Sequence, residues 1–109
     1  MAGTVETPGL LPELLRPLFW DCEFGRLTLP RYPDFIAGRV LSSGGWDQIR
    51  WLRQAIGDDG IRDYLRRTRG RALDRRRIRF WEVVLRLPHE EVSDWLAAPG
   101  RQVWDQRAR

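Results

Sequence analysis

The sequence predicts a small all-α bundle of about five short helices with helix-turn-helix-like units. Three observations predict this class: apolar residues recur at helical spacing, no stretch alternates as a strand would, and glycine and proline punctuate the chain. With 109 residues, the chain is long enough for one modest core. We expect a flexible N-terminal tail over residues 1–9, a helical domain over residues 10–98 and a polar C-terminal tail over residues 99–109.

The first half of the domain is expected to hold a short helix or turn, a connection and two helices. Leu10–Trp20 is apolar but interrupted by prolines, and residues 21–32 are typical of an irregular connection. Pro33 suits the first position of a helix, which ends at the Ser-Ser-Gly-Gly run that follows it. The next helix covers Trp46–Ile56, and Gly57 is a natural cap for its C-terminal end.

The second half is expected to hold three more helical segments. The first covers about residues 60–68 and is broken by Gly70. Asp74 is a good N-cap for the second, and Pro88 opens the last, which ends at Pro99-Gly100. The expected buried faces of these last two helices are Ile78, Trp81, Val84 and Leu85, and then Val92, Trp95 and Leu96.

Tryptophan is unusually frequent. The chain has six, namely Trp20, Trp46, Trp51, Trp81, Trp95 and Trp104. Most are expected in the core, because each aromatic ring contributes a large buried area to a small domain. One or two are candidates for interface anchors, since tryptophan and arginine are the residue types enriched there.

Positive charge is concentrated in one region of the chain. The eighteen residues from 62 to 79 hold nine arginines and only two aspartates, a net charge of +7, whereas the whole chain carries +4. We call these nine residues the arginine belt: Arg62, Arg66, Arg67, Arg69, Arg71, Arg75, Arg76, Arg77 and Arg79. Such local concentration indicates an anionic partner, either nucleic acid or an acidic protein surface.

The expected helices divide the belt into two groups. One forms a stripe on the side of a helix, from Arg62 to Arg69. The other, Arg75–Arg77, lies in the first turn of the next helix, where each cation opposes the helix dipole by about 0.3–1 kcal/mol. Two interpretations remain open. A bound anionic surface relieves this strain, or the arginines form a solvated face in a codon-biased chain and pair with acids such as Asp59 and Glu82.

Catalytic chemistry is not expected. His89 and Cys22 are the single histidine and the single cysteine, so clustered zinc ligands are absent. The glycines do not form a phosphate-binding loop. We therefore expect no enzyme activity, no metal and no cofactor. No apolar run approaches a membrane span and no secretory signal is visible, so a cytoplasmic protein without membrane contact is expected.

Ten short segments, taken in order, match those of a known family. They are Leu18–Asp21, Phe35–Leu41, Gly45-Trp46, Ile49–Leu52, Gly57, Ile61, Arg69, Leu73-Asp74, Phe80-Trp81 and Leu87-Pro88. In these segments the chain resembles small helical bacterial proteins of unknown function that are encoded beside nucleotidyltransferase-type toxins of the abortive-infection class. The resemblance implies a non-catalytic antitoxin that binds and neutralises its toxin.

Two functions follow as hypotheses. In the first, the arginine belt docks on the carboxylate-rich cleft of a nucleotidyltransferase toxin, with an exposed tryptophan, Trp46 or Trp104, as the apolar anchor. In the second, the two helices around Gly57 form a helix-turn-helix that binds DNA or RNA, and the same arginines contact phosphates. The oligomeric state stays open in both.

Overall fold

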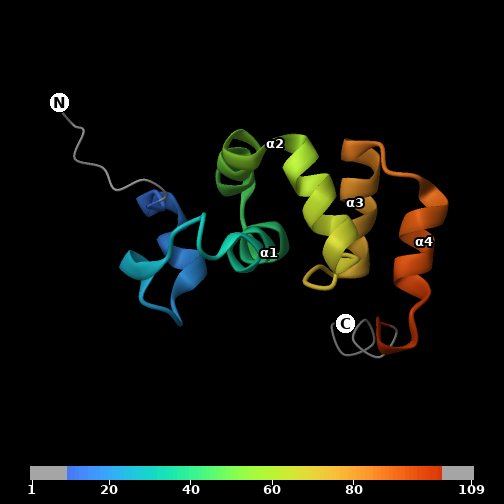
Figure 1. The fold of residues 1–109 in the computed structure, drawn as a ribbon, viewed down its shortest axis with the longest axis horizontal. Helices are drawn as coiled ribbons and strands as arrows, with labels where there is room; N and C mark the ends of the chain where they lie inside the picture. Colours follow the sequence, from blue (N-terminus) through green and yellow to red (C-terminus); the bar gives the residue numbers. More distant parts are fainter. Residues whose placement is uncertain (1–9, 102–109) are drawn as a thin grey trace.

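The computed structural model describes residues 10–101, and this part of the chain is all-α, as the sequence predicts. It holds two short 3₁₀ helices followed by four α-helices (Figure 1). Their bounds are η2 Glu13–Phe19, η3 Phe24–Arg26, α1 Pro33–Ser43, α2 Trp46–Thr68, α3 Arg75–Leu85 and α4 His89–Ala97. The tail expected over residues 1–9 lies outside the described range.

Proline and glycine set the helix boundaries in the first half. Pro33 occupies the first position of α1, where its fixed φ angle suits the helix and its missing N–H is not needed. The 23 residues of α2 are interrupted by Gly57, whose φ of 75° and ψ of 166° are not helical. Glycine adopts this backbone conformation at no steric cost. The structure thus confirms the two predicted helical segments that meet at Gly57.

The turn between α2 and α3 depends on a second glycine. Gly70 has a φ of 65°, and a Cβ atom there would lie 2.7 Å from Cδ1 of Ile78. Asp74 then caps α3, because its Oδ1 accepts a hydrogen bond of 2.8 Å from the backbone N–H of Arg77. This confirms the N-cap predicted at Asp74.

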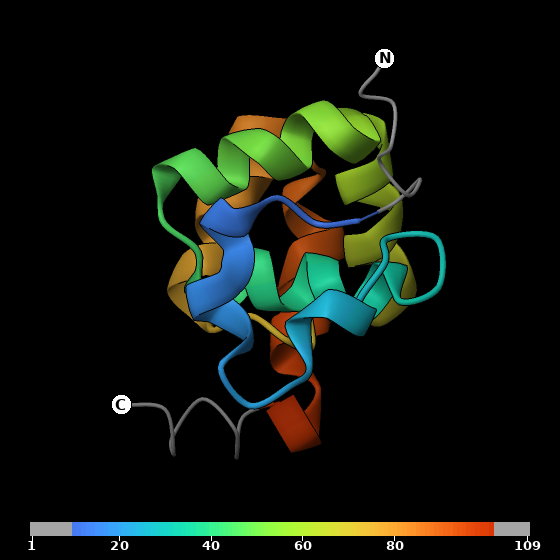
Figure 2. The same cartoon turned by 90° about the vertical axis from the view of Figure 1, so that its left-hand side faces the viewer.

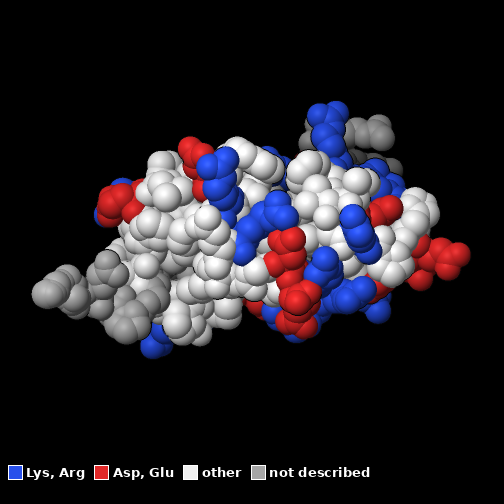
Figure 3. All heavy atoms as spheres, turned by 90° about the horizontal axis from the view of Figure 1, so that it is seen from above, with Lys and Arg blue, Asp and Glu red and all other residues white. Residues whose placement is uncertain are grey.

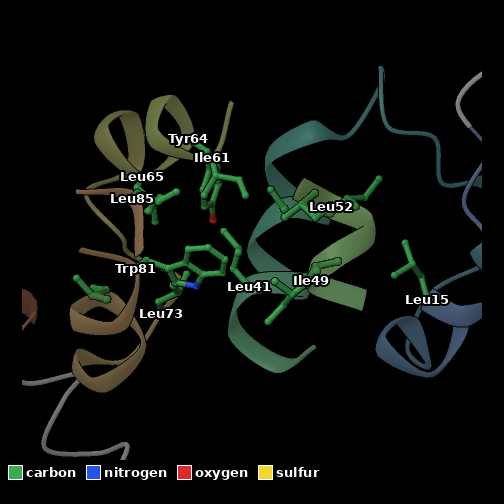
Figure 4. Packing of buried hydrophobic residues seen from close by; sticks show 14 of the residues in the cluster. Leu15, Leu41, Ile49, Leu52, Ile61, Tyr64, Leu65, Leu73, Trp81 and Leu85 are labelled. Carbon is green, nitrogen blue, oxygen red and sulfur yellow. The ribbon is translucent and has the colours of Figure 1, made fainter. Parts of the chain in front are cut away.

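A continuous hydrophobic core joins the two ends of the molecule. α1 packs against η2 and α2, and α3 packs against α4. Figure 2, which views the molecule from the η2 end, shows α2 crossing above α1 and η2. Between α1 and α3, Trp81 of α3, which is 1% exposed, faces Leu41 of α1 (Figure 4). The predicted buried faces of α3 and α4 are confirmed, except that Val84 is only partly buried.

The described tryptophans divide between core and surface. Trp81 and Trp95 are buried and Trp51 is partly buried against the core. Trp20 and Trp46 are 82% and 57% exposed. Trp104, the other candidate anchor, lies outside the described residues.

The end of the domain differs from the expected polar tail. Residues 99–101 are helical, and Arg101 is only 8% exposed. Its guanidinium donates hydrogen bonds to the carbonyl oxygens of Gly70 and Leu73. The first residues beyond the expected boundary therefore belong to the packed domain, while residues 102–109 of that tail lie outside the described range.

Candidate partner-binding site

The belt arginines on α2 pair with carboxylates that lie on α1, on α4 and on α2 itself. Arg67 donates to Asp34 of α1 at 2.7 Å and to Asp63 at 2.8 Å, and these two carboxylates raise the pKa of Arg67. Arg66 donates to Glu91 of α4 at 3.0 Å. These internal partners lower the positive charge that this side of α2 offers to an external partner.

Three belt arginines, among them Arg62 with its expected ion pair to Asp59, donate to carbonyl oxygens at the C-terminal ends of helices. Arg62 donates to Leu85 of α3 at 3.0 Å, Arg75 to Leu96 of α4 at 3.5 Å, and Arg77 to Leu41 of α1 at 2.8 Å. Carbonyls in a last helical turn lack intrahelical partners and carry the negative end of the helix dipole. These contacts offset the unfavourable position of Arg75 and Arg77 at the start of α3 without an external anion.

Arg79 belongs to a polar cluster between α3 and α4. It donates to Glu82, as the spacing of three residues predicts, and to Ser93 Oγ at 3.1 Å. The Nδ1 atom of His89 lies 2.9 Å from the Glu82 carboxylate. The hydrogen bonds from His89 and then Arg79 lower the pKa of Glu82.

Three members of the belt have side chains with no hydrogen-bond or ion-pair partner within residues 10–101: Arg69, Arg71 and Arg76. All three are exposed. Figure 3 shows arginine and acidic side chains next to each other on one face, with most of the basic side chains over the half that contains α3 and α4. The arginines available to an outside partner are therefore far fewer than the nine in the sequence.

Arg76 borders a hollow of about 350 Å³ between the start of α2 and the exposed side of α3. We call this hollow the Trp46 groove. Its described lining residues are Gly44, Trp46, Ile49, Arg76, Arg77, Phe80 and Trp81. The buried Trp81 forms the inner wall, and its ring meets the ring of Phe80 edge-on at a centroid distance of 5.3 Å and an angle of 85°.

Local sequence explains why aromatic rings reach the surface at the groove. Trp46 is the first residue of α2 and follows two glycines, so it lies at a helix end rather than on the buried face. Phe80 directly precedes Trp81, and adjacent residues on a helix point in different directions. With Trp81 in the core, Phe80 is left 46% exposed.

The groove combines a free cation with exposed aromatic surface. None of its described lining residues is acidic. An arginine side chain offers two parallel hydrogen bonds to a carboxylate or phosphate, and aromatic rings supply apolar contact area. This arrangement suits the binding of an anionic surface that also carries an apolar projection.

The single cysteine and the single histidine of the chain lie apart from each other and from the groove. No group of three or more His, Cys, Asp or Glu side chains within residues 10–101 could hold a metal ion. Cys22 lies near η3 and His89 opens α4, at opposite ends of the molecule (Figure 1). Burial is the main cause that raises the pKa of Cys22. None of the described helices is both long and apolar enough to cross a membrane.

Sequence reasoning found Trp46 and Arg76 but missed two residues that matter here. Phe80 enters the sequence analysis only within the Phe80-Trp81 segment of the family resemblance, although two neighbouring aromatics on one helix cannot both face the core. Arg101 carried no signal, because its partners are backbone carbonyls far away in the sequence.

Comparisons with known proteins describe the first half of the molecule. No curated protein and no solved structure matches the chain. The matched segment runs from η2 to the second half of α2, and it ends before Arg66. It therefore includes Trp46 but leaves out Arg76 and Phe80. Over residues 14–65 the chain is similar to a family described as a family of unknown function, DUF6922.

Proposed function

We propose that the chain is a non-catalytic, antitoxin-like protein that binds an acidic surface of a partner protein through the Trp46 groove. One observation carries this proposal: the side chain of Arg76 has no partner within the described residues and lies beside two exposed aromatic rings, Trp46 and Phe80. Exposed tryptophan and arginine side chains of this kind are typical centres of protein interfaces.

The resemblance of the chain to proteins encoded beside nucleotidyltransferase toxins indicates which partner to test first. The cleft of such a toxin must hold metal ions and a nucleotide, so it is rich in carboxylates. Arg76 would pair with one of these carboxylates, and the two rings would cover apolar surface at the rim. Inhibition would be steric, and both proteins would meet in the cytoplasm.

The test is co-purification of the chain with the product of the adjacent toxin gene. The wild-type pair is expected to form a stable complex at moderate salt. Arg76→Glu and Trp46→Ala should each weaken the complex at least tenfold, because each removes a central contact. Helicity measured by circular dichroism should stay at the wild-type level in both variants.

Two matched substitutions serve as controls. Trp20→Ala removes an exposed tryptophan, and Arg50→Glu reverses an exposed arginine of α2 whose side chain has no partner within residues 10–101; neither residue is among the described lining residues of the groove. Both should bind like the wild type. If neither groove variant weakens the complex, or if the wild-type pair does not co-purify, the proposal is wrong.

Nucleic-acid binding is the competing function. Exposed rings beside an arginine also suit stacked bases. Against a helix-turn-helix that reads DNA, the arginines expected on the recognition helix already have internal partners, namely Arg62, Arg66 and Arg67. Binding to the promoter DNA of its own gene, with an affinity that falls steeply with salt, would favour this function over the first.

A further inference from the structure

A second hollow, of about 500 Å³, lies between the end of α2 and the end of α4. We call it the Trp95 hollow. Its described lining residues are Thr68, Arg69, Arg71, Trp95, Ala98, Gly100 and Arg101. It shares no described residue with the Trp46 groove, so the function proposed above does not use it.

The lining of this hollow is strongly basic. It includes three arginines and, among its described residues, no acid. Arg69 and Arg71 are exposed, and their side chains have no hydrogen-bond or ion-pair partner within residues 10–101. Arg101 is buried and anchored to the carbonyl of Gly70 at 2.9 Å, so its charge is fixed in the wall.

Three backbone N–H groups of this turn are already used within the chain. The N–H groups of Arg69 and Gly70 both donate to the carbonyl of Leu65, and the N–H of Arg71 donates to that of Thr68 at 3.1 Å. The guanidinium groups are therefore the main donors that this turn offers to an anion. Positive φ at Arg69 and Gly70 makes this turn tight and places the two free arginines on either side of the glycine.

The hollow also has an apolar side. Trp95 is 6% exposed and forms part of the wall together with Ala98. The volume of the hollow falls within the range of about 300–1,000 Å³ that is usual for small-molecule sites. A ligand with one strongly charged group and one flat apolar group fits this division of the lining.

We propose that the Trp95 hollow binds a phosphate monoester of mononucleotide size. The dianionic phosphate accepts hydrogen bonds from Arg69 and Arg71 in the bidentate manner that guanidinium groups favour. The fixed charge of Arg101 adds to the attraction, and the base lies against Trp95 and Ala98.

The experiment is isothermal titration of the full chain with inorganic phosphate, ribose 5-phosphate and AMP. AMP is expected to bind most tightly, because it alone fills the apolar side. Arg69→Ala/Arg71→Ala should weaken AMP binding tenfold or more. The charge-matched control Arg26→Ala/Arg50→Ala, which removes two exposed arginines elsewhere, should bind AMP like the wild type.

Three results would overturn the assignment. One is the absence of AMP binding at millimolar concentrations, and another is equal affinity in the Arg69→Ala/Arg71→Ala variant and the wild type. The third result comes from titration with a short single-stranded oligonucleotide without a terminal phosphate, which offers only phosphate diesters. If it binds more tightly than AMP, the hollow recognises a nucleic-acid backbone instead. An Arg76→Glu variant should retain AMP binding, which separates this proposal from the function proposed for the groove.

Discussion

Arg76 and Arg77 are neighbours in the sequence and have opposite roles in the structure. Arg77 is partly buried and donates to the carbonyl of Leu41, whereas Arg76 is exposed and borders the Trp46 groove. The same division runs through the whole belt. Arginines that reach a carboxylate or a helix end hold the fold together, and those that reach neither are available for ligands. A local excess of charge therefore locates a basic region but does not identify its binding residues.

The largest expected effect concerns an arginine outside the belt. Arg101→Ala should lower the free energy of unfolding by about 2–3 kcal/mol, because it leaves the buried carbonyls of Gly70 and Leu73 without their charged donor. Chemical denaturation followed by circular dichroism measures this change. Arg50→Ala, which removes an exposed arginine, is the control and should change stability by less than about 0.5 kcal/mol. A loss below 0.5 kcal/mol in Arg101→Ala would contradict a structural role.

Alanine substitutions at Arg76 and at Arg77 test directly whether the two residues have different roles. Arg77→Ala should cost about 1–2 kcal/mol of unfolding free energy, since the carbonyl of Leu41 loses its donor. Arg76→Ala is its matched partner in the same helical turn and should cost almost nothing. Equal losses in the two variants would show that Arg77 is no more structural than Arg76.

Acid should weaken the ion pair between Arg39 and Asp21. Arg39 donates to both oxygens of Asp21, at 2.8 and 3.2 Å, and holds the pKa of Asp21 at about 2, below its ordinary value of 3.8. A lowered pKa in the folded state means that the pair stabilises the fold above pH 3.8, and that this contribution is lost as the pH falls through about 2.

Denaturation of the wild type and of Asp21→Asn between pH 5 and pH 2 measures this loss. The difference between them should shrink as the pH falls. Asp94→Asn, at an exposed position of α4, is the comparison. A difference that stays constant over the whole range would mean that Asp21 contributes no ionic stabilisation.

The smallest effect on stability is expected for the free arginines. Replacing Arg69, Arg71 and Arg76 by alanine should change the unfolding free energy by no more than about 0.5 kcal/mol per site. Removal of Arg76 from the first turn of α3 also removes an unfavourable interaction with the helix dipole. The melting temperature of the triple variant checks this. A large drop in the melting temperature would mean that these three arginines also stabilise the fold.

Sequence patterns predicted the features that depend on residues close together in the chain, such as helix ends, caps and ion pairs within a helix. The start of α1 at Pro33, the cap at Asp74 and the pairing of Arg79 with Glu82 all follow from short spacings, and all are confirmed. Contacts such as that of Arg67 with Asp34 join residues 33 positions apart. They depend on how α1 and α2 pack, so no local pattern predicts them. Contacts between residues far apart in the sequence therefore decide which belt arginines stabilise the fold and which stay available for ligands.

The interruption of α2 at Gly57 also determines the reach of the molecule. A straight helix of 23 residues would extend about 35 Å. Two rods of about half that length can instead turn back, so the first lies on α1 and the second carries Ile61 and Leu65 into the core beside α3. An alanine at position 57 would favour the straight rod and would move its second half away from α3. The bend at Gly57 thus lets the start of α2 line the Trp46 groove while its end lines the Trp95 hollow.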